Sequence, residues 1–155
     1  LGFKAATSPT PKGNDMTVRS AQAHWEGSLI EGEGEVEFLN SNLGSVQDDW
    51  RSRSAETEGR TSPEELIAAA HSACYSMALS HALAGNGTPP AAVDTRADVT
   101  FVAGQGITGI VLTVRASVPG LTADEFAKFA EDAKTGCPVS AALTGTTITL
   151  DAALV

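Results

Sequence analysis

The feature that most constrains the fold is the stretch from Leu66 to Val93, in which no Asp, Glu, Lys or Arg occurs. A stretch of this length is long enough to cross a membrane as a helix. Up to Ala84, however, it contains His71, His81 and three serines with only four leucine or isoleucine residues, and the remainder is rich in glycine and proline. We therefore interpret it as a helix that is buried in a folded domain, and we expect no membrane association.

The start and the end of this helix are marked by typical capping residues. Ser62 is a helix-capping residue, a proline follows it in the first turn, and Glu65 lies three residues after the cap. Glycines at positions 85 and 87 end the pattern, and the prolines at 89 and 90 prevent the helix from resuming. The sequence predicts a helix over about 63–84, roughly 33 Å long.

Between Leu66 and Ala84 this predicted helix carries no charge on any side, so both of its faces are expected to be covered. A domain of about 140 residues is too small to wrap such a helix completely. The sequence therefore predicts a homodimer in which helices and sheets of two chains share one core. One predicted face consists of Leu66, Ala70, Cys74, Met77 and His81, and the opposite face of Ala68, Ser72 and Ser76.

Strand patterns and helix patterns are segregated along the chain, which predicts an α+β fold. Between 31 and 38, glutamates alternate with glycine, valine and phenylalanine, as expected of a strand with one solvated acidic face. This N-terminal half is expected to be antiparallel. The predicted elements are a strand-like region over 21–53 with a returning strand over 45–54, a hairpin of strands 93–103 and 107–118, a helix over 122–136, a helical turn over 138–143 and a strand over 146–152.

Length and composition predict one domain over 16–155, preceded by a tail over 1–15 that is either native or a remnant of expression. The net charge of −9 disfavours binding to nucleic acids and to anionic membrane surfaces. Two cysteines are too few for a disulfide scaffold, and no secretory segment is evident. These features predict a protein of the reducing cytoplasm.

Several residues are candidates for chemistry, although each has an ordinary structural explanation. A cysteine on an apolar helix face, such as Cys74, is most often a small buried hydrophobe. His71 could activate that thiol, but a lone histidine in an alanine-rich helix is more often a packed residue. The cysteines and histidines offer too few ligands for a zinc site, and no phosphate-binding loop or serine-hydrolase motif occurs. The remaining candidates are Cys137, Arg51 or Arg53, and Glu64 or Glu65.

Two blocks that contain the cysteines carry a more specific signal. TSPEELIAAAHSACYSMALSHAL at 61–83 places Cys74 ten residues after Glu64, and GCPVSAAL at 136–143 contains the second cysteine. Together with HWEG at 24–27, these blocks resemble the OsmC/Ohr family, which comprises osmotically inducible protein C and the organic hydroperoxide resistance proteins. The resemblance extends from about Met16 to the C-terminus, and AAHSACYSMAL is more similar to the OsmC branch.

This resemblance implies an OsmC-like α+β fold, with antiparallel sheets packed around the long central helices of an intertwined homodimer. It also implies a thiol-dependent peroxidase that reduces organic hydroperoxides, and hydrogen peroxide less well, through a cysteine sulfenic acid and an intramolecular disulfide. No cofactor is implied; an external dithiol, such as a lipoylated protein or dihydrolipoamide, would regenerate the thiols. The implied roles are Cys74 as peroxidatic cysteine, Cys137 as resolving cysteine, Glu64 as carboxylate and Arg53, with Arg51 as its alternative, as activating arginine.

Thiol chemistry explains why an arginine is expected. A thiol with a pKa near 8.5 is only about 3% thiolate at pH 7, and apolar burial lowers that fraction further. A guanidinium stays charged and donates in a planar fork, so it can hold a thiolate while a carboxylate orients it. Because Glu64 and Cys74 are about 15 Å apart along one helix, we expect Arg53 and Glu64 of one subunit to serve Cys74 of the other.

Two other functions also fit these residues. The chain could be a non-enzymatic dimer that binds a hydrophobic ligand, with Cys74 merely lining the pocket. It could also be a cysteine hydrolase in which His71 activates the nucleophile. A reversible disulfide between Cys74 and Cys137 on addition of stoichiometric hydroperoxide is expected only of the peroxidase.

Overall fold

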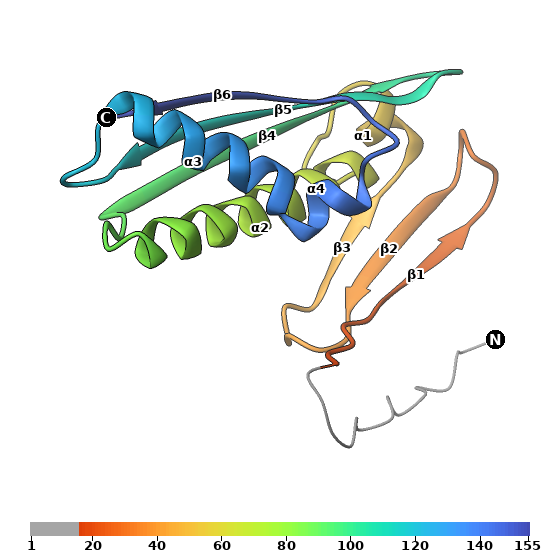
Figure 1. The fold of residues 1–155 in the computed structure, drawn as a ribbon. Coiled ribbons are helices and arrows are strands. Elements are labelled where there is room, and N and C mark those ends of the chain that lie inside the picture. Colours follow the sequence, from red (N-terminus) through yellow and green to blue (C-terminus); the bar gives the residue numbers. More distant parts are fainter. Residues whose placement is uncertain (1–15) are drawn as a thin grey trace. The chain divides into compact units, whose positions relative to one another are not determined.

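The computed structural model describes residues 16–155, so the predicted tail over 1–15 lies outside the described residues. The chain divides into two compact parts, one ending at Trp50 and the other spanning Arg51–Val155. In chain order (Figure 1) the elements are β1 (Ala21–Glu26), β2 (Glu33–Phe38), β3 (Ser45–Asp48), α1 (Trp50–Ser54), α2 (Pro63–Gly85), β4 (Ala92–Val102), β5 (Gly106–Ser117), α3 (Ala123–Gly136), α4 (Pro138–Ala142) and β6 (Ile148–Leu154).

The first part contains an antiparallel sheet with the strand order β1-β2-β3. Along β2 the glutamates are exposed, whereas Gly34 is buried and Val36 and Phe38 are half-buried. Gly34 has no room for a side chain, because a Cβ there would collide with Asp48 and with the ring of Trp25. The predicted strand with one acidic, solvated face is therefore confirmed.

The prediction that the returning strand continues to Ser54 is wrong. The strand β3 ends at Asp48, and the following residues form the short helix α1. Its backbone is satisfied locally, since the N–H of Ala55 donates to the carbonyl of Arg51 at 2.8 Å. The one buried side chain of α1, Ser52, donates its hydroxyl to the carbonyl of Thr61 at 2.6 Å. The segment thus has no apolar side chain in its interior that would favour a strand.

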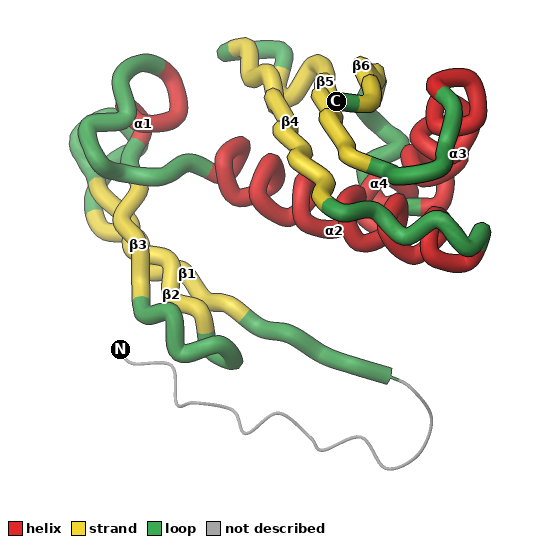
Figure 2. Tube along the Cα trace, turned by 90° about the vertical axis from the view of Figure 1, so that its left-hand side faces the viewer, coloured by secondary structure: helices red, strands yellow, loops and turns green. Residues whose placement is uncertain are grey.

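In the second part, α2, α3 and α4 cover one face of a three-stranded sheet with the order β4-β5-β6 (Figures 1 and 2). β4 and β5 form the predicted antiparallel hairpin. β6, however, lies parallel to β5, so the expectation of purely antiparallel sheets is wrong for this pair. The reason is the connection: the chain crosses over the sheet through α3 and α4, and helical crossovers of this kind join parallel strands.

The two long helices begin at the capping residues that the sequence predicts. Ser62 accepts a hydrogen bond from the backbone N–H of Glu65 at 3.1 Å, and Thr122 forms a capping box with Glu125 at the start of α3. α2 ends at Gly85, one residue beyond the predicted end. Within the described residues, none of the helices combines the length and the apolar character that crossing a membrane requires.

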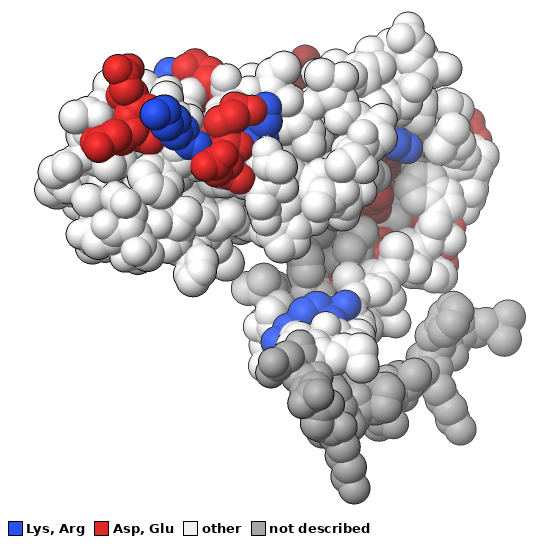
Figure 3. All heavy atoms as spheres, viewed as in Figure 1, with Lys and Arg blue, Asp and Glu red and all other residues white. Residues whose placement is uncertain are grey.

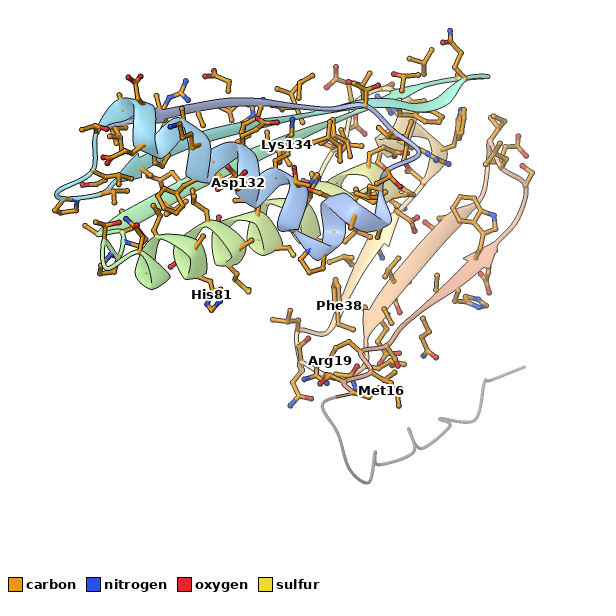
Figure 4. All side chains as sticks on the ribbon, in the orientation of Figure 1. Met16, Arg19, Phe38, His81, Asp132 and Lys134 are labelled. Atoms are coloured by element: carbon orange, nitrogen blue, oxygen red, sulfur yellow. The ribbon has the colours of Figure 1, made fainter. Side chains whose placement is uncertain are left out.

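The core of the same chain covers one side of α2. Tyr75, Leu79 and Leu83 are completely buried in the hydrophobic core. On the predicted face, Met77 is 70% exposed, and His81 points away from the helices and the sheet (Figure 4). Turning a tyrosine and two leucines inward removes more apolar area from water than burying the smaller side chains of the other face.

A continuous uncharged surface therefore remains on the outside of α2. We call it the outer face of α2, and it consists of the exposed residues Ala69, Ala70, Ala73, Met77 and His81. In the space-filling view, α2 is covered by uncharged side chains, whereas acidic and basic side chains gather over α3 (Figure 3).

Candidate active site

The two cysteines of the chain lie against each other. Cys74 is in the middle of α2, and Cys137 lies between the end of α3 and the start of α4. Both are free thiols, and their sulfur atoms are hydrogen-bonded to each other. Cys137 is completely buried, whereas Cys74 is partly exposed. A reagent in solution therefore reaches Cys74 more easily, and Cys137 is placed to react with whatever forms on Cys74.

The backbone on both sides of Cys137 is held by a helix end. Its N–H donates to the carbonyl of Ala133 at the end of α3, at 2.9 Å, and its carbonyl accepts from the N–H of Ala141 at 3.0 Å. Pro138 follows as the first residue of α4, a position that suits proline because its missing N–H is not needed there. The position of the Cys137 thiol is thus determined by the Cys-Pro sequence and the two helices that it joins.

The surroundings shift the pKa values of the two thiols in opposite directions. Burial raises the pKa of Cys74, and the neighbouring Cys137 adds to this rise, which outweighs a hydrogen bond from the backbone of Val139. Burial also acts to raise the pKa of Cys137, but hydrogen bonds from the backbone and the hydroxyl of Ser140 and from Cys74 outweigh it, so this pKa is lowered. Within one chain the pair therefore favours a thiolate on Cys137.

Arg53 and Glu64 form a second, separate cluster. The guanidinium donates from Nε at 3.0 Å and from Nη2 at 2.9 Å to the same carboxylate oxygen, Oε1 of Glu64. It also lies over the ring of Phe101 of β4, 4.3 Å from the ring centre, in a cation–π contact. The other carboxylate oxygen, Oε2, is buried and accepts no hydrogen bond from the described residues. The arginine is therefore held in place by two neighbouring residues, while the second oxygen of the carboxylate can still accept a hydrogen bond.

Arg51, the alternative to Arg53, does not belong to this cluster. On a helix, residues two apart point to different sides, and Arg51 forms an ion pair with Glu58 at 2.8 Å in which both side chains are more than half exposed. Arg53, in contrast, borders a cavity of about 330 Å³ at the start of α2. The cavity is lined by Arg53, Thr57, Ser62, Glu64, Glu65, Ala68, Ala97, Asp98, Val99 and Phe101.

The structure does not join the two clusters within one chain. Glu64 lies in the first turn of α2, and Cys74 lies ten residues later, about 15 Å along the helix axis. None of the causes that shift the pKa of Cys74 is an arginine of the described part of the chain. The geometry therefore contains a thiol pair without a cation and an arginine–carboxylate pair without a thiol.

His71 and Ser140 are two further buried polar residues beside the cysteines. His71 is completely buried, and its Nε2 lies 2.7 Å from the hydroxyl of Ser140, which is 4% exposed. Burial lowers the pKa of His71, so the imidazole is neutral. The burial of His71 and its contact with Ser140 agree with the more common interpretation of such a histidine as a packed residue. Ser140 was not among the predicted site residues. The Ser140 hydroxyl could not have been identified, because one serine three residues after a cysteine has no distinctive pattern.

Within residues 16–155, no three side chains of histidine, cysteine, aspartate or glutamate come together in a way that could hold a metal ion. His71 and Cys74, the one local pair that the sequence offers, have different partners. His71 contacts Ser140, and Cys74 contacts Cys137.

Comparisons with known proteins agree with this arrangement. Residues 56–151 match the OsmC family, described as OsmC-like protein. The chain is 44% identical over 140 residues to peroxiredoxin OsmC of Escherichia coli (strain K12), which covers 88% of this chain and 96% of the relative. The same figures hold for peroxiredoxin OsmC of Shigella flexneri.

Solved structures share the fold. The organic hydroperoxide resistance protein OsmC from Legionella pneumophila superposes with a TM-score of 0.65 at 24% identity, covering 90% of this chain and 99% of that one. The organic hydroperoxide resistance protein OhrB of Bacillus subtilis gives a TM-score of 0.67 at 20% identity, covering 86% and 97%. The expected OsmC-like α+β fold is confirmed, and the chain belongs to the OsmC-like protein family.

Proposed function

We propose that this protein is a thiol-dependent peroxidase that reduces organic hydroperoxides. The observation that carries this proposal is the contact between the accessible Cys74 and the buried Cys137. A peroxidase of this kind needs one thiol that the peroxide can reach and a second thiol that traps the oxidised form. The peroxiredoxins named above and the hydroperoxide resistance proteins of the same fold support this assignment.

The reaction follows from the positions of the two thiols. The Cys74 thiolate attacks the distal oxygen of the hydroperoxide, the O–O bond breaks, and the alkoxide takes up a proton to leave as an alcohol. Cys74 becomes a sulfenic acid. The Cys137 thiolate then attacks the Cys74 sulfur, so that the disulfide forms and the sulfenic oxygen leaves as hydroxide, which is protonated to water.

The cation that Cys74 needs comes from a second copy of the chain. Within one chain burial raises the pKa of Cys74, and Arg53 is engaged with Glu64 at the start of α2. An intertwined homodimer would place Arg53 and Glu64 of one subunit beside the partner's Cys74. Arg53 has donors that Glu64 does not use, because a guanidinium carries five N–H groups. They would hold the thiolate and lower the pKa of Cys74.

The outer face of α2 supports such a dimer. In an antiparallel pair of helices related by a two-fold axis, residues at equal distances from the axis face each other. Ala69 is exposed and lies halfway between Glu64 and Cys74. An axis beside Ala69 would bring Glu64 of one subunit level with the partner's Cys74 along the two helices, and the alanines around it allow the helices to approach closely.

The surface around Cys74 favours an organic hydroperoxide over hydrogen peroxide. Cys74 borders the outer face of α2, which carries no charge and exposes Met77. In the proposed dimer, the edge of this face that the partner leaves uncovered would line the approach to Cys74. An alkyl or fatty chain gains free energy by leaving water for such a surface, whereas hydrogen peroxide has no apolar part. The substrate class is therefore a hydroperoxide with a hydrophobic chain.

The disulfide between Cys74 and Cys137 requires an external dithiol for its reduction. Because Cys137 is buried, the reductant attacks the Cys74 sulfur and releases Cys137 as the leaving group. A dihydrolipoyl group, which is a dithiol on an apolar chain, fits the same uncharged surface as the substrate. The cytoplasm is the expected compartment, since such a cycle needs a supply of reduced dithiols.

The proposal is tested by measuring turnover rates with cumene hydroperoxide, linoleic acid hydroperoxide and hydrogen peroxide, with dihydrolipoamide as the reductant. The peroxidase is expected to consume both organic hydroperoxides faster than hydrogen peroxide and to lose activity in Cys74→Ser. A protein that only binds hydrophobic ligands would show no turnover and a slow, unselective oxidation of both thiols. A cysteine hydrolase would be indifferent to peroxide and would depend on His71.

A further inference from the structure

We propose that His71 and Ser140 form a buried hydrogen-bond chain that ends at the sulfur of Cys137 and so controls the closure of the disulfide. This inference rests on the proposed peroxidase function and adds two positioning residues to it. The chain runs from α2 through α4 to the resolving cysteine, and it does not touch the peroxide.

Three buried groups form this chain. Nε2 of His71 lies 2.7 Å from the Ser140 hydroxyl, and that hydroxyl hydrogen-bonds the sulfur of Cys137. His71 and Cys137 are completely buried, and Ser140 is 4% exposed. A polar chain that is shielded from water interacts strongly, because each bond polarises the next in a low dielectric.

The direction of the hydrogen bonds follows from the number of protons available. A hydroxyl has one proton, and if Ser140 donates it to the Cys137 thiolate, its oxygen must accept from Nε2–H of His71. The neutral imidazole then carries no proton on Nδ1, the buried ring nitrogen that has no partner among the described residues. The other tautomer would bury an N–H without an acceptor, which is rare in proteins. The chain therefore runs from His71 through Ser140 to the sulfur.

Few other groups act on Cys137. Besides Ser140, the side chain of Cys74 and the backbone of Val139 shift its pKa, and no charged side chain of the described residues takes part. Besides burial, a negative charge on Cys137 also helps to raise the pKa of Tyr75 of α2, but the Tyr75 hydroxyl donates to the carbonyl of Ala130 at 2.8 Å and not to the sulfur. Apart from Cys74, the Ser140 hydroxyl, with His71 behind it, is thus the side-chain donor that the described residues offer to Cys137.

The chemistry of the second step explains what this arrangement achieves. The Cys137 thiolate attacks the sulfur of the Cys74 sulfenic acid, the S–S bond forms and the S–O bond breaks. The hydroxide that leaves combines with the proton that Cys137 released on ionisation, so water is the only other product. Cys74 is reduced from sulfenic acid to disulfide while Cys137 is oxidised. The rate of closure is proportional to the fraction of Cys137 that is thiolate.

The oxidation of Cys74 and the closure of the disulfide can be measured separately over a range of pH. The reaction is quenched rapidly with acid, the free thiols are alkylated, and the products are identified by mass spectrometry. Ser140→Ala and His71→Leu each remove a donor, and we expect closure to slow roughly tenfold at pH 7 and its pH midpoint to rise by about one unit. In His71→Gln the side-chain amide can still donate an N–H to the Ser140 hydroxyl, so this variant is expected to keep most of the rate of disulfide closure. The exposed His24→Leu serves as the control and is expected to change neither step.

A second measurement does not depend on peroxide chemistry. In the Cys74→Ser protein Cys137 is the remaining thiol, and its ionisation can be followed by thiolate absorbance in the ultraviolet. Adding Ser140→Ala is expected to raise the titration midpoint by about one unit. An unchanged midpoint, or closure that is as fast in Ser140→Ala as in the wild type, would overturn the proposal. Failure of Cys74 to react with peroxide would instead refute the proposed function, and the titration would still decide on the hydrogen-bond chain.

Discussion

Arg53 and Glu64 form an asymmetric ion pair in which two guanidinium nitrogens donate to one carboxylate oxygen, at 3.0 and 2.9 Å. The second oxygen of Glu64 is buried without a hydrogen-bond donor among the described residues. A pair that served only to stabilise the fold would be expected to use both oxygens in a parallel, bidentate arrangement. The observed geometry instead orients the arginine and leaves part of both groups available for a third partner.

Replacement of Arg53 should slow the oxidation of Cys74. We expect Arg53→Ala to reduce the second-order rate with cumene hydroperoxide by roughly a hundredfold, because a charge-assisted hydrogen bond to the thiolate is lost. The measurement is stopped-flow oxidation under single-turnover conditions. Arg51→Ala is the matched control, since Arg51 forms an exposed pair with Glu58 and is expected to be nearly silent. An equal loss in both variants would contradict the role of Arg53.

Complementation tests whether the arginine acts across the subunit interface. Cys74→Ala and Arg53→Ala homodimers are each expected to have almost no activity. After subunit exchange, a mixed dimer contains one site with both an intact Cys74 and an intact Arg53, so activity should return. The exchange itself can be verified with differently tagged chains. Exchange without any recovery of activity would show that Arg53 serves the cysteine of its own chain.

A charge placed on the outer face of α2 should dissociate the dimer. In Ala73→Glu a carboxylate would be buried between two chains without a partner, which is costly. We expect the protein to sediment as a monomer and to lose peroxidase activity. Ala127→Glu is the matched control, because Ala127 is also exposed but lies on α3, away from the outer face of α2. If Ala73→Glu remains a dimer of normal activity, the interface lies elsewhere.

The burial of His71 should make the fold sensitive to acid. Its pKa is lowered from 6.5 by burial, so the unfolded chain binds this proton more readily than the folded chain. The contribution of His71 to stability is therefore complete above pH 6.5 and is lost as the pH falls through the lowered value. We expect the urea midpoint of the wild type to fall between about pH 7 and pH 5.

His71→Leu should show a flatter pH dependence over the same range, whatever its stability at neutral pH, where the contact with Ser140 is absent. His24→Leu should keep the wild-type slope, since His24 is exposed. An unchanged slope in His71→Leu would mean that other groups cause the acid sensitivity.

The elements that the sequence predicts correctly have strong local signals. The capping residues Ser62 and Thr122 mark the starts of α2 and α3, and alternation along β2 identifies its acidic face. The proximity of Cys74 to Cys137 has no local signal, since it depends on the packing of α4 against α2. This proximity could be predicted only from the resemblance to the OsmC/Ohr family.

The incorrect predictions have identifiable physical causes. Which side of α2 packs into its own chain stayed open in the sequence, because neither side carries charge between Leu66 and Ala84 and both were expected to be covered; the large side chains of Tyr75 and Leu79 turn inward. The direction of β6 depends on the crossover through α3 and α4. Ser140 was missed because its importance arises from a contact with His71, which lies far away in the sequence.

The measurement that tests the account most directly is mass analysis of the wild-type protein after one equivalent of cumene hydroperoxide. We predict a single intrachain disulfide between Cys74 and Cys137 that forms in proportion to the peroxide added, and dihydrolipoamide should reverse it. In Cys137→Ser the same treatment should leave a sulfenic acid on Cys74 that a dimedone probe captures. Two thiols that survive the treatment, or a mixture of over-oxidised products without this disulfide, would contradict the account.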